Sequence, residues 1–280
     1  DSSGNPLKAS DTAHRAASHR SRELSSWLPP LGSADSDLLG ELPTLVSRSR
    51  DLTRNHGVAA GAMQTLSDNV VGTGLRLSAT PDYKALGKDK AWADEWARDV
   101  ESQWRAWAES TACDAANSLN FAGLTSLVFR SSLINGEALA LPLWLDRRGN
   151  DFATTIQLVE ADRLSNPIGK QDNIDAYGAP RAYHIRKNHP GDAYLGAGGG
   201  SEQDWQRIPV RTAFGRKRVL HIHDKERTGQ HRGKPLLSSI MPMFKMLDHY
   251  ERSELQAAVV NAMIAAFIET PLDGESIGEM

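Results

Sequence analysis

Two histidines separated by one residue, His221 and His223, are the side chains of this sequence best suited to catalytic chemistry. In a β-strand, side chains two apart lie on one face, so both imidazoles could bind one zinc ion. A metal-dependent hydrolase that uses this pair is therefore one hypothesis. The alternative is an ordinary half-buried strand in which Val219, Leu220 and Ile222 pack inward and both histidines face outward. The sequence has no second cluster of metal ligands and no His-Glu-x-x-His motif, so we favour the strand, without a bound metal or cofactor.

Glu160 and Asp162 form a second candidate site, because paired carboxylates can perform acid–base or magnesium chemistry. Arg163 could neutralise one of them, and a polar strand end or turn is the interpretation we favour. The single cysteine, Cys113, lies in a polar stretch without a glycine-rich nucleophile turn or a neighbouring base, and no Gly-x-Ser-x-Gly element occurs. We therefore expect no catalytic residues and no enzyme. One cysteine excludes an intrachain disulfide and fits a reducing cytoplasm.

A basic segment, residues 207–234, could contact phosphates or an acidic face of a neighbouring molecule. Its cations are Arg207, Arg211, Arg216, Lys217, Arg218, Lys225, Arg227, Arg232 and Lys234. The sequence leaves both alternatives open, although a formal net charge of −3 argues against a dedicated nucleic-acid-binding domain. The glycine-rich stretch 196–200 lacks the Lys-Ser/Thr of a phosphate-binding loop.

The elements that must position these residues predict an α+β fold, because helices come first, strands follow, and a long helix closes the chain. Helical spacing predicts helices over about 44–70 with Thr44 as N-cap, 88–109, and 119–135 with Gly136 as a left-handed cap. Strands are expected at 75–78, 138–145, 154–160, 182–186, 207–210 and 218–223. Tryptophans at helical spacing along 88–109 indicate a packing stripe, with nucleic-acid stacking as the alternative.

Residues 236–268 predict one long helix that is interrupted near its start. Pro235 suits the first helical position, and Pro242 predicts a restart at Met241 or Pro242. The second half, 257–268, is apolar on every side except at Asn261, yet is shorter than the roughly 20 residues of a membrane span. Such a helix must be enclosed by protein, either as the core helix of one domain or by packing against copies of itself.

Several stretches in a fixed order resemble the portal proteins of lambda-type tailed phages. They are Arg48-Ser-Arg-Asp-Leu-Thr-Arg-Asn55, Val71-Gly-Thr-Gly-Leu75, Glu160-Ala-Asp-Arg-Leu164, Arg227-Thr-Gly-Gln-His-Arg-Gly-Lys-Pro235 and Tyr250-Glu-Arg-Ser-Glu-Leu-Gln-Ala-Ala258. The resemblance covers about 27–268, and its specificity lies in the order of the stretches rather than in any one of them.

The resemblance implies a structural protein of the virion, assembled in the host cytoplasm, that forms a dodecameric homo-oligomeric ring at one capsid vertex. Double-stranded DNA would pass through the ring without sequence-specific binding. The implied protein partners are the terminase large subunit, the major capsid and scaffold proteins, and the head–tail connector, and no membrane is involved. Members of this family continue beyond the length seen here, into the rest of the clip, a returning stem helix, a tunnel loop and a crown.

The resemblance also divides the chain into parts. The composition of residues 1–43, rich in Ser, Ala, Asp, Gly and Pro, predicts an extended N-terminal arm, partly disordered. The resemblance implies a wing at 44–235 with helices and a small mixed or antiparallel sheet, a stem helix at 236–268, and the start of a clip at 269–280. The family-motif loop comprises Arg227, Gly229, Gln230, Arg232, Gly233 and Pro235. DNA-channel candidates are Lys245, Asp248, His249 and Arg252, and subunit-interface candidates are Ala258, Ala262, Ala265, Ala266 and Phe267.

Overall fold

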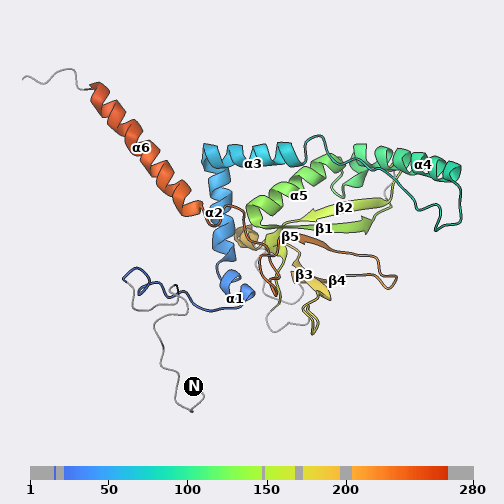
Figure 1. Ribbon diagram of the computed structural model, residues 1–280, viewed down its shortest axis with the longest axis horizontal. Helices are drawn as coiled ribbons and strands as arrows, with labels where there is room; N and C mark the ends of the chain where they lie inside the picture. The colour runs from blue at the N-terminus through green and yellow to red at the C-terminus, as the bar shows by residue number, and fades with distance from the viewer. Residues whose placement is uncertain (1–15, 17–21, 147–148, 168–172, 196–203, 264–280) are drawn as a thin grey trace, which may run out of the picture.

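The computed structural model describes residues 16, 22–146, 149–167, 173–195 and 204–263. Six α-helices are described: α1 (Ala34–Leu38), α2 (Leu42–Asn55), α3 (Gly57–Val70), α4 (Lys90–Glu109), α5 (Phe121–Asn135) and α6 (Met241–Met263). Five strands are described: β1 (Glu137–Trp144), β2 (Thr154–Val159), β3 (Ala182–Arg186), β4 (Trp205–Pro209) and β5 (Leu220–His223). Short 3₁₀ turns lie at η2 (Thr111–Cys113), η3 (Ala161–Arg163) and η4 (Pro190–Leu195). The predicted α+β class is confirmed (Figure 1).

The strands form two small antiparallel sheets. One sheet has the order β2-β1-β5, and the other pairs β3 with β4. On one face of β1, Leu139 and Leu141 pack with Ile185 and Ile208 of the second sheet in the main hydrophobic core. The opposite face of β1 carries alanine side chains, and α5 lies along β1 and β2 (Figure 1). The first sheet is therefore enclosed between a helix and a second sheet.

The helix predicted over 44–70 is wrong in two respects. It begins earlier, at Leu42, with Pro43 in its first turn and Glu41 rather than Thr44 at the N-cap. It is also broken at His56, whose extended backbone (φ −112°, ψ 112°) separates α2 from α3. The break turns α3 across the end of α2 (Figure 1) and places the His56 ring edge-on against Phe244 of α6, with ring centroids 5.1 Å apart. At this position the chain makes a long-range contact between His56 and Phe244 where a continuous helix was predicted.

The other predicted elements differ mainly at their ends. The stretch 75–78 forms no strand, and the remaining predicted strands are present with bounds shifted by up to two residues. Asn120 is the N-cap of α5, accepting a hydrogen bond from Gly123 N, and Gly136 ends it with φ +87° as expected. The expected extended arm contains a short helix, α1, in its described part, because Leu38 packs with Leu42 and Val46 of α2.

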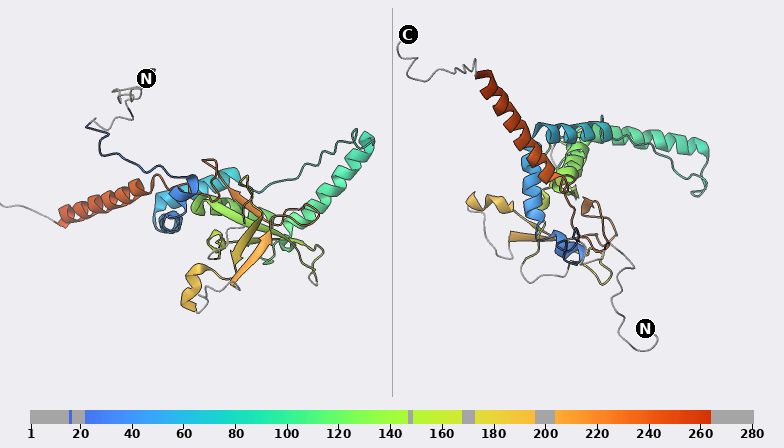
Figure 2. Two further views of the ribbon diagram at one scale, coloured as in Figure 1. Left: turned by 90° about the horizontal axis from the view of Figure 1, so that it is seen from below. Right: turned by 60° about the vertical axis from the view of Figure 1, so that its left-hand side comes forward.

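Helix α6 begins at Met241, as the Pro242 argument predicted, and projects from the body (Figures 1 and 2). Only its root is packed: Met241, Phe244 and the preceding Leu237 join residues of α2, α3 and α5 in one cluster. Beyond this root the described residues of α6 are mostly exposed, including apolar ones such as Met246 and Met263. No described helix is long and apolar enough to cross a bilayer.

Candidate functional site at the root of the long helix

A buried carboxylate, Glu137, lies where α5 turns into β1. Gly136 ends the helix in the left-handed conformation, and the next residue opens β1 with its side chain on the core face. The Glu137 side chain is 1% exposed, so its charge has to be compensated by neighbouring groups. The backbone carbonyl of Glu137 also accepts a hydrogen bond from Ser131 Oγ at 2.9 Å.

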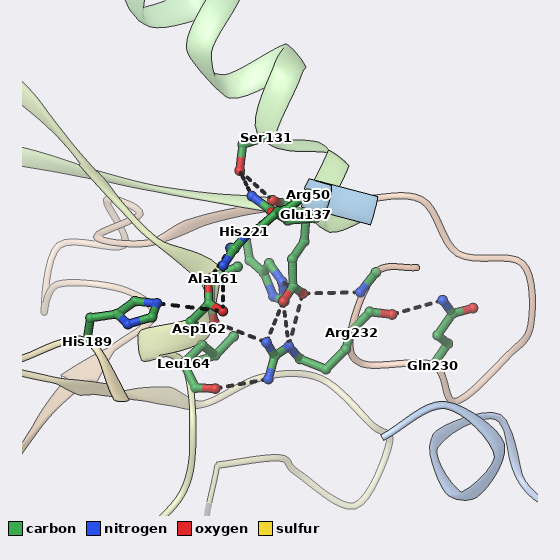
Figure 3. A network of polar contacts seen from close by, with 12 residues as sticks. Arg50, Ser131, Glu137, Ala161, Asp162, Leu164, His189, His221, Gln230 and Arg232 are labelled. Atoms are coloured by element: carbon green, nitrogen blue, oxygen red, sulfur yellow. Dashed lines mark hydrogen bonds and ion pairs between the residues drawn. The ribbon is translucent and has the colours of Figure 1, made fainter. Parts of the chain in front are cut away.

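Arg232 and His221 supply the compensation (Figure 3). The Arg232 guanidinium donates from Nε to Glu137 Oε1 at 2.7 Å and from Nη1 to the Leu164 carbonyl at 2.9 Å. His221 Nε2 lies 2.9 Å from Glu137 Oε2, and the backbone N–H of Gly233 donates to the same oxygen at 3.1 Å. The four groups form one network that joins β1, β5 and the family-motif loop.

The network changes the ionisation of Glu137. Burial alone would raise the pKa of Glu137, but hydrogen bonds from His221 and Arg232 and the charge of Arg232 lower that pKa to about 2. Glu137 is therefore a carboxylate at neutral pH. Its function in this geometry is to bind the motif loop, since each carboxylate oxygen already accepts hydrogen bonds from the protein.

The expectation that His221 and His223 face outward is wrong. Their strand pairs with β1 so that Leu139 lies opposite His221 and Glu137 opposite His223, which puts both imidazoles on the core face. The His221 side chain is 4% exposed, whereas Ile222, expected to be inside, is 42% exposed. Burial of an imidazole is tolerated here because a carboxylate faces it, and a sequence pattern does not show that partner.

His223 is the unsatisfied member of the pair. Its ring lies 4.3 Å from that of His221, and both of its nitrogens are buried without a hydrogen-bond partner among the described residues. Burial, followed by the charge of His221, lowers the pKa of His223 to about 4. Because His221 Nε2 faces Glu137, that nitrogen is not available to a metal. No group of three potential ligands occurs in the described parts of the chain.

The family-motif loop is folded around its own glutamine. Gln230 is 4% exposed; its Oε1 accepts from Glu226 N at 2.9 Å and its Nε2 donates to the Arg232 carbonyl at 2.8 Å. Gly229 takes φ +80° in the preceding turn. Gly233 and Gly136 pass so closely that a Cβ on either would overlap the other's backbone or that of Lys234.

The loop then joins the helices at its C-terminal end. Pro235 is fully buried, and the Leu236 N–H donates to the Leu133 carbonyl of α5 at 2.9 Å. The six residues of the motif therefore fix the root of α6 against α5 and β1.

A second ion pair lies beside the first. Arg50 of α2 donates from Nη1 to Asp162 Oδ1 at 3.1 Å and from Nε to Asn135 Oδ1 at 2.8 Å (Figure 3). Burial would raise the pKa of Asp162, but the hydrogen bonds and charge of Arg50 lower it. Arg163, which the sequence suggested as the neutralising residue, instead donates to the Arg186 carbonyl at 2.7 Å.

Helix α1 contacts the family-motif loop through two aspartates. The His231 N–H donates to Asp35 Oδ1 at 3.0 Å, and His231 Nδ1 lies 2.6 Å from Asp35 Oδ2. Arg227 donates to Asp37 Oδ2 at 2.6 Å. Arg227 and Arg232 of the basic segment thus form ion pairs within the chain, as Lys234 does with Glu226.

Three of the four DNA-channel candidates share one side of α6. Arg252 Nε donates to Asp248 Oδ1 at 3.1 Å, and Lys245 Nζ lies 3.7 Å from Asp248 Oδ2. These three residues line a groove of about 450 Å³ against α2. Both cations are about three-quarters exposed, so their charges reach solvent, and His249 is exposed too.

The subunit-interface candidates are only partly described. Ala258 and Ala262 are exposed on α6, as are Val259 and Val260, each about half accessible. Ala265, Ala266 and Phe267 lie outside the described residues. The described part of this chain does not enclose the apolar end of α6, which is what a core helix would have required.

The remaining candidates are accounted for locally. Cys113 is buried, and burial with the nearby Asp114 raises the pKa of its thiol, which disfavours a nucleophile. Trp104 and Trp107 pack against Phe121 with ring centroids 5.1 and 5.4 Å away, as the packing stripe predicted. A groove of about 790 Å³ is lined mainly by residues of α2, α5, β1 and β2 and does not include Glu137 or His221.

Sequence reasoning missed Glu137, Arg50 and the two aspartates of α1. For Glu137 a signal existed: a single acidic residue opens the otherwise apolar run Glu137-Ala-Leu-Ala-Leu141, directly after a helix-ending glycine. Such a residue at the start of a buried strand indicates a compensated internal charge. Arg50 and Asp35 carried no comparable signal, since charged residues on short helices are usually solvated.

Comparisons of this sequence with a family model and with curated proteins point to one family. The family described as "Phage portal protein, lambda family" matches residues 20–280. Portal protein B of Escherichia phage lambda is 32% identical over 273 residues, 94% of this chain and 50% of that protein. The portal protein of Escherichia phage N15 is 34% identical over 264 residues, 91% of this chain and 48% of that protein.

The chain spans about half the length of these curated relatives. Among solved structures, a chain from the virion of a native gene transfer agent particle aligns with a TM-score of 0.33 at 16% identity, covering 78% of this chain and 58% of that one.

Proposed function

Because this chain belongs to the lambda family of phage portal proteins, we propose that it acts as a structural subunit of the portal ring of a phage virion, without enzymatic activity. In this proposal the subunits form a dodecameric ring at one capsid vertex, and double-stranded DNA passes through it during packaging and ejection. The terminase large subunit, the capsid and scaffold proteins and the head–tail connector dock on it.

The observation that supports a ring best is the exposure of α6. A helix of 23 residues projects from the body with apolar side chains accessible along most of its described length. Exposed apolar surface of this extent is typical of an interface with another protein. Identical subunits in a closed ring would cover it by placing helices side by side. In this proposal residues 236–268 form the stem, and Ala258 and Ala262 allow close helix approach.

The network around Glu137 supports a mechanical function. It attaches the loop that carries α6 to both the sheet and α5, so force on the stem is transmitted to the wing, residues 44–235. The geometry around the two histidines does not favour the alternative hydrolase, because His221 Nε2 faces Glu137 and the His221 side chain is buried.

The proposal is tested on the full-length protein by light scattering and negative-stain microscopy. Ala258→Trp and Ala262→Trp should overpack the stem contact, costing about 1–3 kcal/mol per site and reducing the fraction of rings. Gln256→Trp, on the opposite side of α6, is the matched control and should assemble normally. A protein that remains monomeric at high concentration in several salts would contradict a ring, and normal assembly of both alanine variants would contradict the close packing.

A further inference from the structure

An apolar groove lies along α4, which forms one end of the molecule, away from α1 below α2 and from the segment that leads into α1 (Figures 1 and 2). Its volume is about 470 Å³. The lining side chains are mainly aromatic and aliphatic: Leu77, Trp96, Val100, Trp104, Trp107 and Phe152, with Asp99, Gln103 and Thr154 at the margin.

The aromatic rings of this groove are held in place. Trp107 donates from Nε1 to the Thr154 carbonyl at 2.8 Å, and its ring lies 5.0 Å from that of Trp104. Phe121 packs against both. The groove is therefore formed before anything binds to it, which lowers the entropic cost of binding.

One segment of the same sequence has the chemistry that such a groove recognises. Trp27-Leu-Pro-Pro-Leu31 is exposed throughout, with Trp27 66%, Leu28 65% and Leu31 103% accessible. The two prolines favour the extended polyproline II conformation, and aromatic-lined grooves are the usual receptors of such segments. Its C-terminal end is anchored, since Ser33 caps α1, and α1 is bound to the motif loop by the Arg227–Asp37 ion pair and by a hydrogen bond from the His231 N–H to Asp35.

The charges flanking the two surfaces are complementary. Residues 12–26, which precede the segment, contain three arginines and one glutamate. Helix α4 carries five acidic residues (Asp94, Glu95, Asp99, Glu101 and Glu109) against three basic ones (Lys90, Arg98 and Arg105). The basic residues would thus approach an acidic helix when the apolar segment enters the groove.

We propose that Trp27–Leu31 of one subunit docks in the tryptophan-lined groove of α4 on the adjacent subunit. Because the two surfaces lie on different parts of one chain, a contact between copies would be head to tail, the type of interface that closes a ring. The inference rests on the proposed ring and adds a specific contact to it.

Disulfide trapping between two separately made full-length variants tests the contact. One carries Leu31→Cys and the other Gln103→Cys, and the native Cys113 is buried. The two variants are mixed, assembled under mild oxidation and separated on a denaturing gel without reductant. They should give a disulfide-linked dimer. Ser102→Cys, exposed on the opposite side of α4, is the matched control and should give several-fold less.

The outcomes separate this contact from the ring itself. If rings form but Gln103→Cys and Ser102→Cys give equal amounts of linked dimer, or none, the docking is overturned and the ring is not. A mixture that stays monomeric by light scattering overturns both.

A second measurement compares two tryptophan substitutions, Trp27→Ala and Trp144→Ala. The two residues are similarly exposed, at 66% and 70%. Trp27→Ala should raise the subunit concentration needed for half-assembly by roughly tenfold or more, as expected for a central aromatic anchor. Trp144→Ala should leave assembly unchanged, and equal behaviour of the two variants overturns the docking.

Discussion

At the scale of single residues, the main feature is the buried carboxylate of Glu137. Glu137 is compensated by one guanidinium, one imidazole and one backbone amide, all from residues that lie 84 to 96 positions away in the sequence. Buried pairs of this kind contribute little net stability when intact, but the loss of one partner leaves a charge without compensation. This asymmetry makes the network measurable.

Arg232→Met should therefore destabilise the fold by about 3–5 kcal/mol, because Glu137 would remain buried and charged. Lys234→Met in the same loop is the control: its partner Glu226 has a side chain that is 57% exposed, and the loss should be about 1 kcal/mol or less. The measurement is the free energy of unfolding in urea. Similar losses for the two variants would show that the Glu137 network does not hold the loop.

His223, whose ring nitrogens are buried, predicts a pH dependence. Its pKa is about 4 in the folded chain, below the ordinary value of about 6.5, so the unfolded chain takes up a proton first as the pH falls. The stability associated with neutral His223 is complete above about pH 6.5 and is lost between about pH 6.5 and 4. Glu137, whose pKa is lowered to about 2, loses its contribution only in a more acidic range.

His223→Phe should accordingly flatten the decline of unfolding free energy between about pH 6.5 and 4 relative to the unmodified chain. Urea titrations across this range measure the difference in slope. An identical slope in both proteins would mean that His223 does not take up its proton preferentially on unfolding.

At the scale of elements, the contact between Gly136 and the motif loop determines how α5, β1 and α6 meet. Gly136 ends one helix and begins a strand, and it also leaves space for the Gly233–Lys234 backbone. A side chain at this position would separate the loop from the sheet.

Gly136→Ala should cost several kcal/mol, because it adds steric overlap to the strain of a positive φ. Gly215→Ala provides the comparison: it has nearly the same backbone angle, φ +82°, but no atom lies within 4 Å of the added Cβ. That variant should lose only about 1–2 kcal/mol. Thermal unfolding distinguishes them, and equal losses would show that the close backbone approach has no energetic importance.

At the scale of the whole molecule, charge decides how a ring would handle DNA. The first half of α6 carries Lys245 and Arg252 against Asp248, Glu251 and Glu254, so it is slightly acidic. Symmetry repeats each charge around a channel, and each neutralised phosphate increases affinity through counterion release. We propose that the first half of α6 lines the channel of such a ring, where this composition would repel DNA weakly and allow it to slide.

The assembled ring should therefore bind duplex DNA weakly, with a shallow dependence on salt. Binding measured across a salt series tests this, with Lys245→Glu and Arg252→Glu as channel variants and Arg98→Glu on α4 as a control. Tight binding with a steep salt slope that the two α6 variants abolish, and the control does not, would show that this helix grips DNA.

Local signals in the sequence were sufficient for much of the framework. The start of α6 at Met241, the Gly136 cap of α5 and the positions of five strands follow from proline, capping and periodicity, which act over a few residues. The order of short motifs was sufficient for the family, and the match over residues 20–280 confirms it.

Only the tertiary structure decided which groups meet. The inward orientation of His221, the pairing of Asp162 with Arg50 rather than Arg163, and the break at His56 each depend on a partner from a distant part of the chain. A sequence pattern treats polar residues as outward because burial of a charge is costly, and it does not register a compensating partner. The exposed end of α6 also depends on tertiary structure. Its apolar residues indicate burial, but no surface in the described part of the chain covers them.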